Sequence, residues 1–524
     1  MSLFDEADIV VVGFGGAGAA CAIAAADHGA SVIVLEKQPS DRHTPSTFMS
    51  GGIVMAVNDV DRAAVYMDRC SGGMIPFAVS RAWATMAADL VGWLDRIGAD
   101  LALVKVGEGE NTQFEGADAV EAWTQSRPPS DFAPGLRDLS APATVGALAS
   151  GMNTGEAGRR TGAEYFDSLR RVVASREQIR VRYASPAARL IQDETGRVTG
   201  VRAGDGSVLR ARRGVVLTCG GYEWNDEIKI NALKASPIYF YGNPGNTGDG
   251  IRMAQAVGAD LWHMNQMIGR AIGHFTEDGR DYNFVIGIHP PGYLITDKYG
   301  QRFANEVSQA QMKHSFYYEL LKYDAEKQEY PRNPCYWVFD ERRLSAAPLA
   351  SLRSGFVRAG YYDWSPDNSR EVAKGWIKKA DNIAELGKLA GVSDPDALAE
   401  TVARYNAGCA SGVDEFGRPA DTLVPLDSPP YYCVAMFPGG PNTCGGPRKD
   451  ERARVLDAFG APIPGLYAAG ELGEAVGLLY PANGANLSES VCFGRIAAAD
   501  ALGVDALSSP SSVLGFRSRG AGRL

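Results

Sequence analysis

The 524-residue sequence has no CxxC pair among its eight cysteines. This absence excludes the ligand spacing of zinc ribbons, clustered iron–sulfur sites and CxxCH haem attachment. Several cysteines lie within apolar stretches, so we expect buried free thiols in a reducing compartment, the cytoplasm. No metal site is predicted from these residues.

The chain also lacks a dominant basic run, and its formal net charge is −10. Nucleic acid and an anionic membrane surface are therefore not expected as partners. Residues 9–26 form 18 uncharged residues, a length close to that of a membrane span. Four glycines in the first ten of them favour a strand, a tight turn and a helix instead. The acidic start MSLFDEAD does not resemble a signal peptide.

Glycine, in contrast, is abundant, with 61 residues, or about 12% where ~7% is usual. A GxGxxG motif at residues 13–18 follows the β-branched run 9–12, and an alanine-rich helix and a second strand, 31–35, come next. Glu36 lies 23 residues after Gly13. In such a β-α-β unit the glycines allow the turn, the approach of a pyrophosphate and helix packing, and the acid binds a ribose. The segment therefore predicts a dinucleotide site.

Three later segments favour FAD as the dinucleotide. Residues 46–52 are rich in hydroxyls and glycine, which suits ribityl and pyrophosphate contacts. Residues 186–217 predict a β-meander and a returning strand. Residues 465–471 predict a strand that ends in a glycine and Glu471, whose carboxylate can accept hydrogen bonds from ribityl hydroxyls. These pieces close one dinucleotide domain from both ends of the chain.

The set resembles the FAD-dependent flavoprotein superfamily of fumarate reductases, succinate dehydrogenases and 3-ketosteroid dehydrogenases. Further matches are the TGDG segment at 247–250, the DxxGxRFxNE turn at 297–306 and the closing flavin helix from 484. The resemblance spans roughly residues 8–502 and implies FAD as the cofactor. The cofactor-binding residues that it and the glycine motif imply are Gly13, Gly15, Gly16, Ala17, Gly18, Glu36, Lys37, Ser46, Thr47, Ser50, Gly51, Gly52, Ala187, Gly220, Asp249, Glu471, Asn486 and Leu487.

The resemblance also implies how FAD is attached and how the chain is divided. Succinate dehydrogenases link FAD through a histidine shortly before the glycine pair, whereas His43 lies about two residues out of that register, so non-covalent FAD is expected. The implied fold is α/β, with a discontinuous Rossmann-like FAD-binding domain at 1–266 and 432–505. An inserted α+β cap, the substrate domain, takes 267–431, and 506–524 is expected to be a flexible tail.

Three positions argue against C4-dicarboxylate reduction of the fumarate reductase kind. The acid arginine of that branch is replaced by Ala310, its substrate histidine by Asn442, and the segment 481–487 contains no cation. The segment from Tyr480 to Gly484 is instead similar to the YxxxG element of the 3-ketosteroid Δ1-dehydrogenases. In that branch the tyrosine hydroxyl and the glycine N–H hold the substrate ketone, where two donors stabilise enolate character.

The resemblance therefore implies a dehydrogenase that introduces a C=C bond α,β to the carbonyl of a cyclic ketone. Ala310 stands where the steroid branch has its tyrosine base, so the base has moved or the substrate differs. If 307–320 is helical, His314 and Tyr317 share a face with that position and are the candidate bases.

The substrate is expected to be a small hydrophobic ketone, 3-ketosteroid-like or a smaller ring such as 4-oxocyclohexanecarboxylate. A carboxylate would need a cation, and the candidates are Arg270, Arg302 and Arg353. The electron acceptor is open between oxygen, a quinone and a carrier. Two alternatives remain: a flavin-dependent enone or enoate reductase, and a flavoprotein subunit of a larger electron-transfer assembly.

Overall fold

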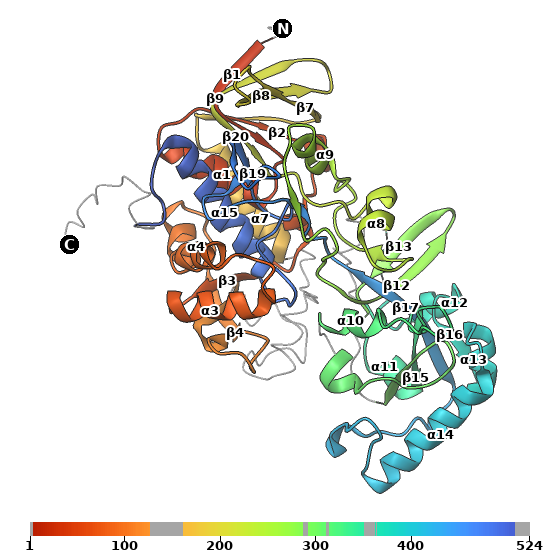
Figure 1. Ribbon diagram of the computed structural model, residues 1–524. Coiled ribbons are helices and arrows are strands. Elements are labelled where there is room, and N and C mark those ends of the chain that lie inside the picture. The colour runs from red at the N-terminus through yellow and green to blue at the C-terminus, as the bar shows by residue number, and fades with distance from the viewer. Residues whose placement is uncertain are drawn as a thin grey trace, which may run out of the picture.

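The computed structural model describes residues 4–125, 161–286, 292–310, 314–350, 362 and 364–508. Most of the expected tail, residues 509–524, lies outside them. The described residues form a larger body and a smaller lobe, which is at the lower right of Figure 1.

A parallel sheet lies at the centre of the larger body. Its strands are β1 (Phe4–Val12), β2 (Val32–Leu35), β6 (Ile179–Arg182), β7 (Ala187–Gln192), β8 (Val198–Ala203), β9 (Val208–Leu217), β19 (Arg454–Leu456) and β20 (Pro462–Ala468). The order is β19-β20-β9-β1-β2-β6, and β7 and β8 extend from β9 as the predicted antiparallel meander. The β1–β2, β1–β9, β2–β6 and β9–β20 pairs are parallel. Buried parallel strands need apolar residues on both faces, and Val32–Leu35 is buried throughout.

Two helices from opposite ends of the chain pack together on this sheet. They are α1 (Gly16–Asp27) and α15 (Ala485–Leu502). A Cβ atom on Gly494 would lie 2.5 Å from the carbonyl oxygen of Ala17. The two helices therefore approach this closely only because the residues at their contact have small side chains or none. The glycine turn and the C-terminal helix are thereby held in one structure, as predicted. Among the described residues, no helix has both the length and the apolar character needed to cross a bilayer.

A layer of helices and a small sheet covers the side of the body near α15. Its elements are α2 (Ser46–Met49), β3 (Val54–Val57), α3 (Val60–Ser71), α4 (Phe77–Ala87), α5 (Leu90–Arg96), β4 (Leu103–Glu108), β5 (Val120–Gln125) and α7 (Thr161–Ala174). The strands are ordered β3-β5-β4 and are antiparallel. Trp83 and Trp93 are fully buried in the core beneath this layer.

A second, mostly antiparallel sheet forms the smaller lobe. Its strands are β10 (Tyr239–Phe240), β12 (Arg270–Glu277), β13 (Arg280–Phe284), β14 (Tyr293–Thr296), β15 (Cys335–Asp340), β16 (Lys378–Ala380) and β17 (Tyr431–Gly440). The order is β13-β12-β17-β15-β14, and β10 and β16 also pair with β17. Helices α11 (Glu341–Ala346), α13 (Ile383–Ala390) and α14 (Pro395–Ser411) belong to this lobe (Figure 1). Its core holds an aromatic cluster that includes Phe275, Trp337, Trp364 and Trp376.

The strand β17 joins the lobe to the body. It starts at residue 431, so almost all of it lies beyond the boundary near 432 that the sequence suggested, yet it is the central strand of the lobe. In Figure 1 it runs from the middle of the molecule into the lobe. The α/β fold with a parallel sheet and an added lobe is confirmed. The division at 266 and 432 stays a prediction, and the pairing of β17 favours extending the cap to about 440.

Arg302 lies inside the lobe as part of a buried ion network. Its guanidinium contacts Glu306 at 2.7 Å and Asp414 at 2.6 Å, and Arg418 approaches Glu306 at 3.4 Å. All four side chains are at most 3% exposed. Because two carboxylates already neutralise it, Arg302 is not a candidate for binding a substrate carboxylate.

Candidate active site

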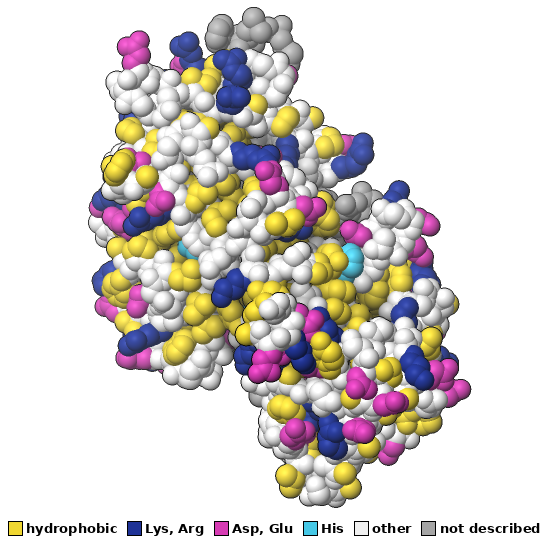
Figure 2. All heavy atoms as spheres, turned by 45° about the vertical axis from the view of Figure 1, so that its right-hand side comes forward, with side chains coloured by type: hydrophobic (Ala, Val, Ile, Leu, Met, Phe, Trp, Pro, Cys, Tyr) yellow, Lys and Arg dark blue, Asp and Glu magenta, His cyan; other side chains and the backbone are white. Residues whose placement is uncertain are grey.

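One pocket runs from the glycine turn of the body to the start of β12 in the lobe. In Figure 2 hydrophobic side chains gather across the middle of the molecule, between the body and the lobe. The predicted site residues on the wall of the pocket are Gly13, Gly15, Gly16, Ala17, Glu36, Lys37, Ser46, Thr47, Ser50, Gly51, Gly52, Ala187, Gly220, Asp249, His314, Glu471, Tyr480, Gly484, Asn486 and Leu487. Gly18 and Tyr317 are not on the wall.

The glycine turn requires glycine for two separate reasons. Gly13 has a φ of +104°, and a Cβ atom there would lie 2.5 Å from the carbonyl oxygen of Thr218. A Cβ atom on Gly18 would lie 2.1 Å from the carbonyl oxygen of Gly13, so Gly18 allows the helix to pack on the strand. The start of α1 consequently lies at the wall of the pocket, where its dipole favours an anionic group such as a pyrophosphate.

Glu36, the predicted ribose-binding acid, lies on the wall of the pocket. Its carboxylate accepts hydrogen bonds from the N–H groups of Phe14, at 2.9 Å, and Gln38, at 2.7 Å. Burial alone would raise the pKa of Glu36, but His43 and these two amides hold it below the ordinary value. Glu36 is therefore a fixed carboxylate that retains acceptor capacity toward the pocket.

His43 lies behind Glu36 and is not on the wall of the pocket. Its ring stacks on Phe14 with centroids 5.4 Å apart, and Nε2 lies 3.4 Å from a carboxylate oxygen of Glu36. The side chain is buried between these neighbours. This position gives the imidazole no direct path to a group in the pocket.

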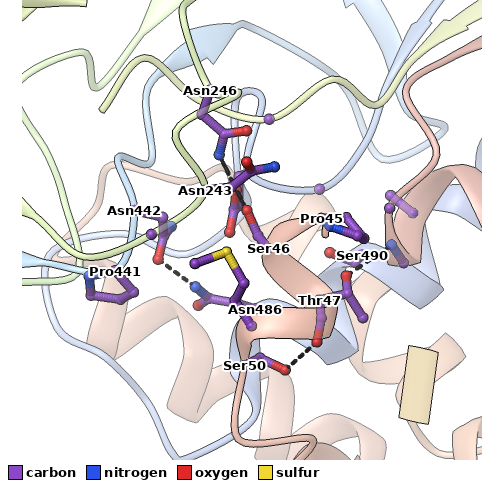
Figure 3. Close-up of a pocket in the computed structure, with 18 of the residues that line it drawn as sticks. Pro45, Ser46, Thr47, Ser50, Asn243, Asn246, Pro441, Asn442, Asn486 and Ser490 are labelled. Atoms are coloured by element: carbon purple, nitrogen blue, oxygen red, sulfur yellow. Dashed lines mark hydrogen bonds between the residues drawn. The ribbon is translucent and has the colours of Figure 1, made fainter. Parts of the chain in front are cut away.

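A polar cluster marks the middle of the pocket. Glu471 accepts hydrogen bonds from Ser46 Oγ at 3.0 Å and from Asn246 Nδ2 at 2.9 Å. Figure 3 shows Asn246 and Ser46 joined, with Asn243 beside them. Asn246 directly precedes the TGDG segment and was not among the predicted site residues. Its position directly before that motif is the feature of the sequence that could have identified it as a site residue.

Lys37 and Asp249 connect the second strand to the TGDG segment. The two charges lie 2.7 Å apart, and Lys37 also donates to Thr247 Oγ1 at 2.9 Å. Together with the glycine turn, Glu36 and the Glu471 cluster, these residues supply donors and acceptors for the whole length of a dinucleotide. The residues present therefore fit FAD.

Tyr480 and Gly484 both line the pocket. Gly484 is the residue before α15 and has a φ of +95°, and a Cβ atom there would lie 2.7 Å from the carbonyl carbon of Val54. Burial raises the pKa of Tyr480, while the backbone N–H groups of Asn486 and Gly484 act in the opposite direction. Both residues line the pocket, and their use as a pair of donors to a ketone stays a prediction.

A network outside the pocket holds the Tyr480 segment in place. Asn111 Nδ2 donates to the carbonyl oxygen of Tyr480 at 3.0 Å, and Tyr66 Oη donates to that of Pro481 at 2.5 Å. On the inner side, Asn442 accepts a hydrogen bond from Asn486 Nδ2 at 2.7 Å, as Figure 3 shows. Asn442, which stands where reductases have a histidine, therefore positions the start of α15.

His314 is brought to the pocket, and its ring centroid lies 4.6 Å from that of Tyr480. Its Nδ1 lies 3.2 Å from the carbonyl oxygen of Gly269, and its Nε2 lies 2.7 Å from Nη2 of Arg270. The carbonyl requires a proton on Nδ1, so Nε2 is the acceptor. Burial lowers the pKa of His314 well below its ordinary value, and the charge of Arg270 lowers it further. The imidazole is therefore neutral.

Tyr317 is not brought to the pocket. The π-helix Glu306–Ala310 and the short helix α10 (Phe316–Leu320) replace the single helix considered for 307–320, and residues 311–313 lie outside the described chain. The Tyr317 ring packs on Gly269, where a Cβ atom would lie 2.3 Å from it. Its role in the structure is to support the residue before Arg270.

Comparison with known proteins places the chain in a family. Residues 8–487 match the family model described as "FAD binding domain", so the chain belongs to this family of FAD-binding domains. It is 29% identical to the 3-oxosteroid 1-dehydrogenase of Mycobacterium tuberculosis, over 94% of this chain and 98% of that protein. It is 31% identical to the 4-oxocyclohexanecarboxylate 2-dehydrogenase of Sinomonas cyclohexanicum, over 58% of this chain and 54% of that protein.

Solved structures show the same fold. The 3-ketosteroid Δ1-dehydrogenase of Sterolibacterium denitrificans, solved with 1,4-androstadiene-3,17-dione, superposes with a TM-score of 0.79 at 24% identity, over 95% of this chain and all of that chain. The chain is therefore an FAD-dependent oxidoreductase of the family that contains the ketosteroid dehydrogenases and the fumarate reductases. The expectation of FAD is confirmed.

Proposed function

We propose that the protein introduces a C=C bond α,β to the carbonyl of a cyclic ketone. The observation that carries this proposal is that Tyr480 and Gly484 both line the pocket, while the segment 481–487 contains no reductase arginine. When bound, FAD supplies the hydride acceptor. Relatives named as dehydrogenases of ring ketones support the assignment.

The protein side chains act on the ketone oxygen and on the α proton. The hydroxyl of Tyr480 and the N–H of Gly484 donate to the oxygen and stabilise the negative charge that develops there. The α proton leaves to a base, the hydride leaves from Cβ, and the electron pair of the α C–H bond forms the C=C bond. His314 lies beside Tyr480 and is a candidate base from the sequence, but its Nε2 atom accepts a hydrogen bond from Arg270, which favours a positioning role for the imidazole.

FAD is proposed to be bound without a covalent link, because His43 is enclosed by Phe14 and Glu36 behind the wall. All eight cysteines are free, and this supports the proposal of a reducing, cytoplasmic location. The electron acceptor is proposed to be oxygen, a quinone or a carrier.

An anaerobic panel of ketones tests the reaction directly. Saturated monocyclic and steroid ketones are mixed with the FAD-loaded enzyme, and bleaching of the flavin absorbance is followed. We expect at least one saturated ketone to bleach the flavin and to yield the enone. The alternative, an enone reductase, predicts the reverse: no saturated ketone bleaches the oxidised flavin, and an enone reoxidises the reduced flavin.

A further inference from the structure

The charged side chains on the wall of the pocket are not all neutralised. Lys37 pairs with Asp249, and Glu36 and Glu471 are satisfied by amides and hydroxyls. Arg270 is different, since no carboxylate of the described residues lies within 4.0 Å of it. Its Nε is buried and has no hydrogen-bond partner among the described residues. Within the part of the chain that the structure describes, it is thus a cation on the pocket wall without a counter-charge.

The backbone fixes the position of Arg270. It is the first residue of β12, where it pairs with Gly439 of the central strand β17. The preceding residue, Gly269, is covered by the ring of Tyr317 and accepts the hydrogen bond from His314. The side chain therefore extends from a rigid sheet rather than from a free loop.

His314 orients the guanidinium without neutralising it. Because Nδ1–H donates to the Gly269 carbonyl, Nε2 can only accept, and it accepts from Nη2 of Arg270 at 2.7 Å. One guanidinium edge is thereby occupied by a neutral partner, while the full positive charge remains. The remaining N–H groups suit the two oxygens of a carboxylate, which a planar guanidinium binds bidentately.

We propose that Arg270, positioned by His314, is an anion subsite and that the substrate is therefore a ketone acid whose carboxylate binds there. This inference rests on the proposed function for the ketone end. A neutral ketone would leave a partly buried guanidinium unpaired, which is unfavourable. Arg270 and Tyr480 both contact His314, so the carboxylate and the ketone belong to one compact molecule.

Binding of a matched pair of ligands tests the subsite without requiring turnover. We would titrate the FAD-loaded enzyme with 4-hydroxybenzoate and with 4-hydroxybenzamide, following the flavin absorbance. Both carry a hydroxyl at the ketone position, neither has a saturated C–H bond from which a hydride could be removed, and they differ by one charge. A charged hydrogen bond to a carboxylate predicts that the benzoate binds about 10- to 100-fold more tightly than the amide.

Variants of Arg270 separate the subsite from a role in holding the flavin. Arg270→Gln should abolish the preference for the benzoate while FAD content and amide affinity stay unchanged, and Arg270→Lys should retain part of it. His314→Phe should weaken the preference, because the guanidinium loses its orientation. Arg280→Gln removes the same charge from the exposed start of β13 (Arg280–Phe284) and should change nothing.

Three results would overturn the subsite. They are equal affinity of the wild-type enzyme for both ligands, an unchanged preference in Arg270→Gln, and loss of FAD in both Arg270 variants, which would assign the arginine to the cofactor. The proposal of an anion subsite and the proposal of a dehydrogenase reaction can be contradicted independently of each other. A benzoate preference in an enzyme that no ketone bleaches would uphold the subsite and contradict the dehydrogenase reaction.

Discussion

Glu223 is a fully buried carboxyl group, and its charge interacts with that of Glu471, a partly buried carboxyl group on the wall of the pocket. Burial raises the pKa of both, and the negative charge of Glu471 raises that of Glu223 further. Glu223 accepts from the N–H of Thr443 at 2.7 Å, but its second oxygen has no partner among the described residues. At neutral pH the pair therefore holds a proton that it would lose in the unfolded chain.

This pair should make the flavin-free protein less stable as the pH rises. The unfolded carboxyl loses its proton near the ordinary value of 4.5, while the folded one keeps it to a higher pH, so stability falls between those values. Glu223→Gln cannot ionise and should flatten this slope, with a gain of about 1–3 kcal/mol at pH 8. Thermal unfolding of both proteins at pH 5.5 and pH 8 measures this difference in stability.

The exposed Glu194→Gln is the matched control and should leave the slope unchanged. If Glu223→Gln destabilises the protein at pH 8 as strongly as at pH 5.5, the account of a shared proton is wrong.

The helix α15 is fixed to the body by a buried ion pair. Lys449 and Glu489 are both fully buried and contact each other, and Glu489 also accepts from the N–H of Gly470 at 2.8 Å. The ammonium group lies 4.3 Å from the centre of the Phe493 ring. The same helix begins at the residue that follows Gly484, so the pair stabilises the element on which the ketone site depends.

Lys449→Met should destabilise the FAD-loaded enzyme by about 3–5 kcal/mol, because it leaves a buried carboxylate without its cation. The double variant Lys449→Met/Glu489→Gln should recover much of that loss. Urea unfolding of both variants measures the difference. A double variant no more stable than the single one would show that packing, rather than the unpaired charge, is responsible.

The elements that could be predicted are those set by local sequence. The turn at Gly13, the strand 32–35 and the β7–β9 meander follow from glycine positions and β-branched runs, and the structure shows all three. The pairing of β10 with β17 joins residues about 200 positions apart in sequence, and no local pattern predicts it. Arg270 was one of three candidate cations in the sequence, but its contact with His314 joins residues 44 positions apart, and no local pattern predicts that contact.

Both ends of the chain contribute to the central sheet of the body and to the pocket on it. Residues 1–266 supply the glycine turn, but β20, Glu471 and α15 come from 462–502. Without them, α1 loses the helix that covers its buried alanines, and the pocket loses one side. The parts that bind FAD are thus distributed over the sequence, and the lobe is inserted between them.

Truncation should therefore affect FAD binding according to position. A chain of residues 1–508 should purify with the same FAD content as the full chain, because every described contact to the pocket remains. Residues 1–266 alone should retain no FAD. The ratio of flavin to protein absorbance gives both values, and FAD retained by the 1–266 fragment would contradict the closure from both ends.

Tyr480 is proposed to donate to the ketone oxygen as charge develops there. Tyr480→Phe removes the hydroxyl and almost no volume, and kcat for the best ketone should fall about 10²- to 10³-fold. KM should change little, because the interaction is strongest near the transition state. FAD content should persist, and Tyr323→Phe, at an exposed position, should behave as the wild type. A Tyr480→Phe enzyme with full FAD and wild-type kcat would contradict the account.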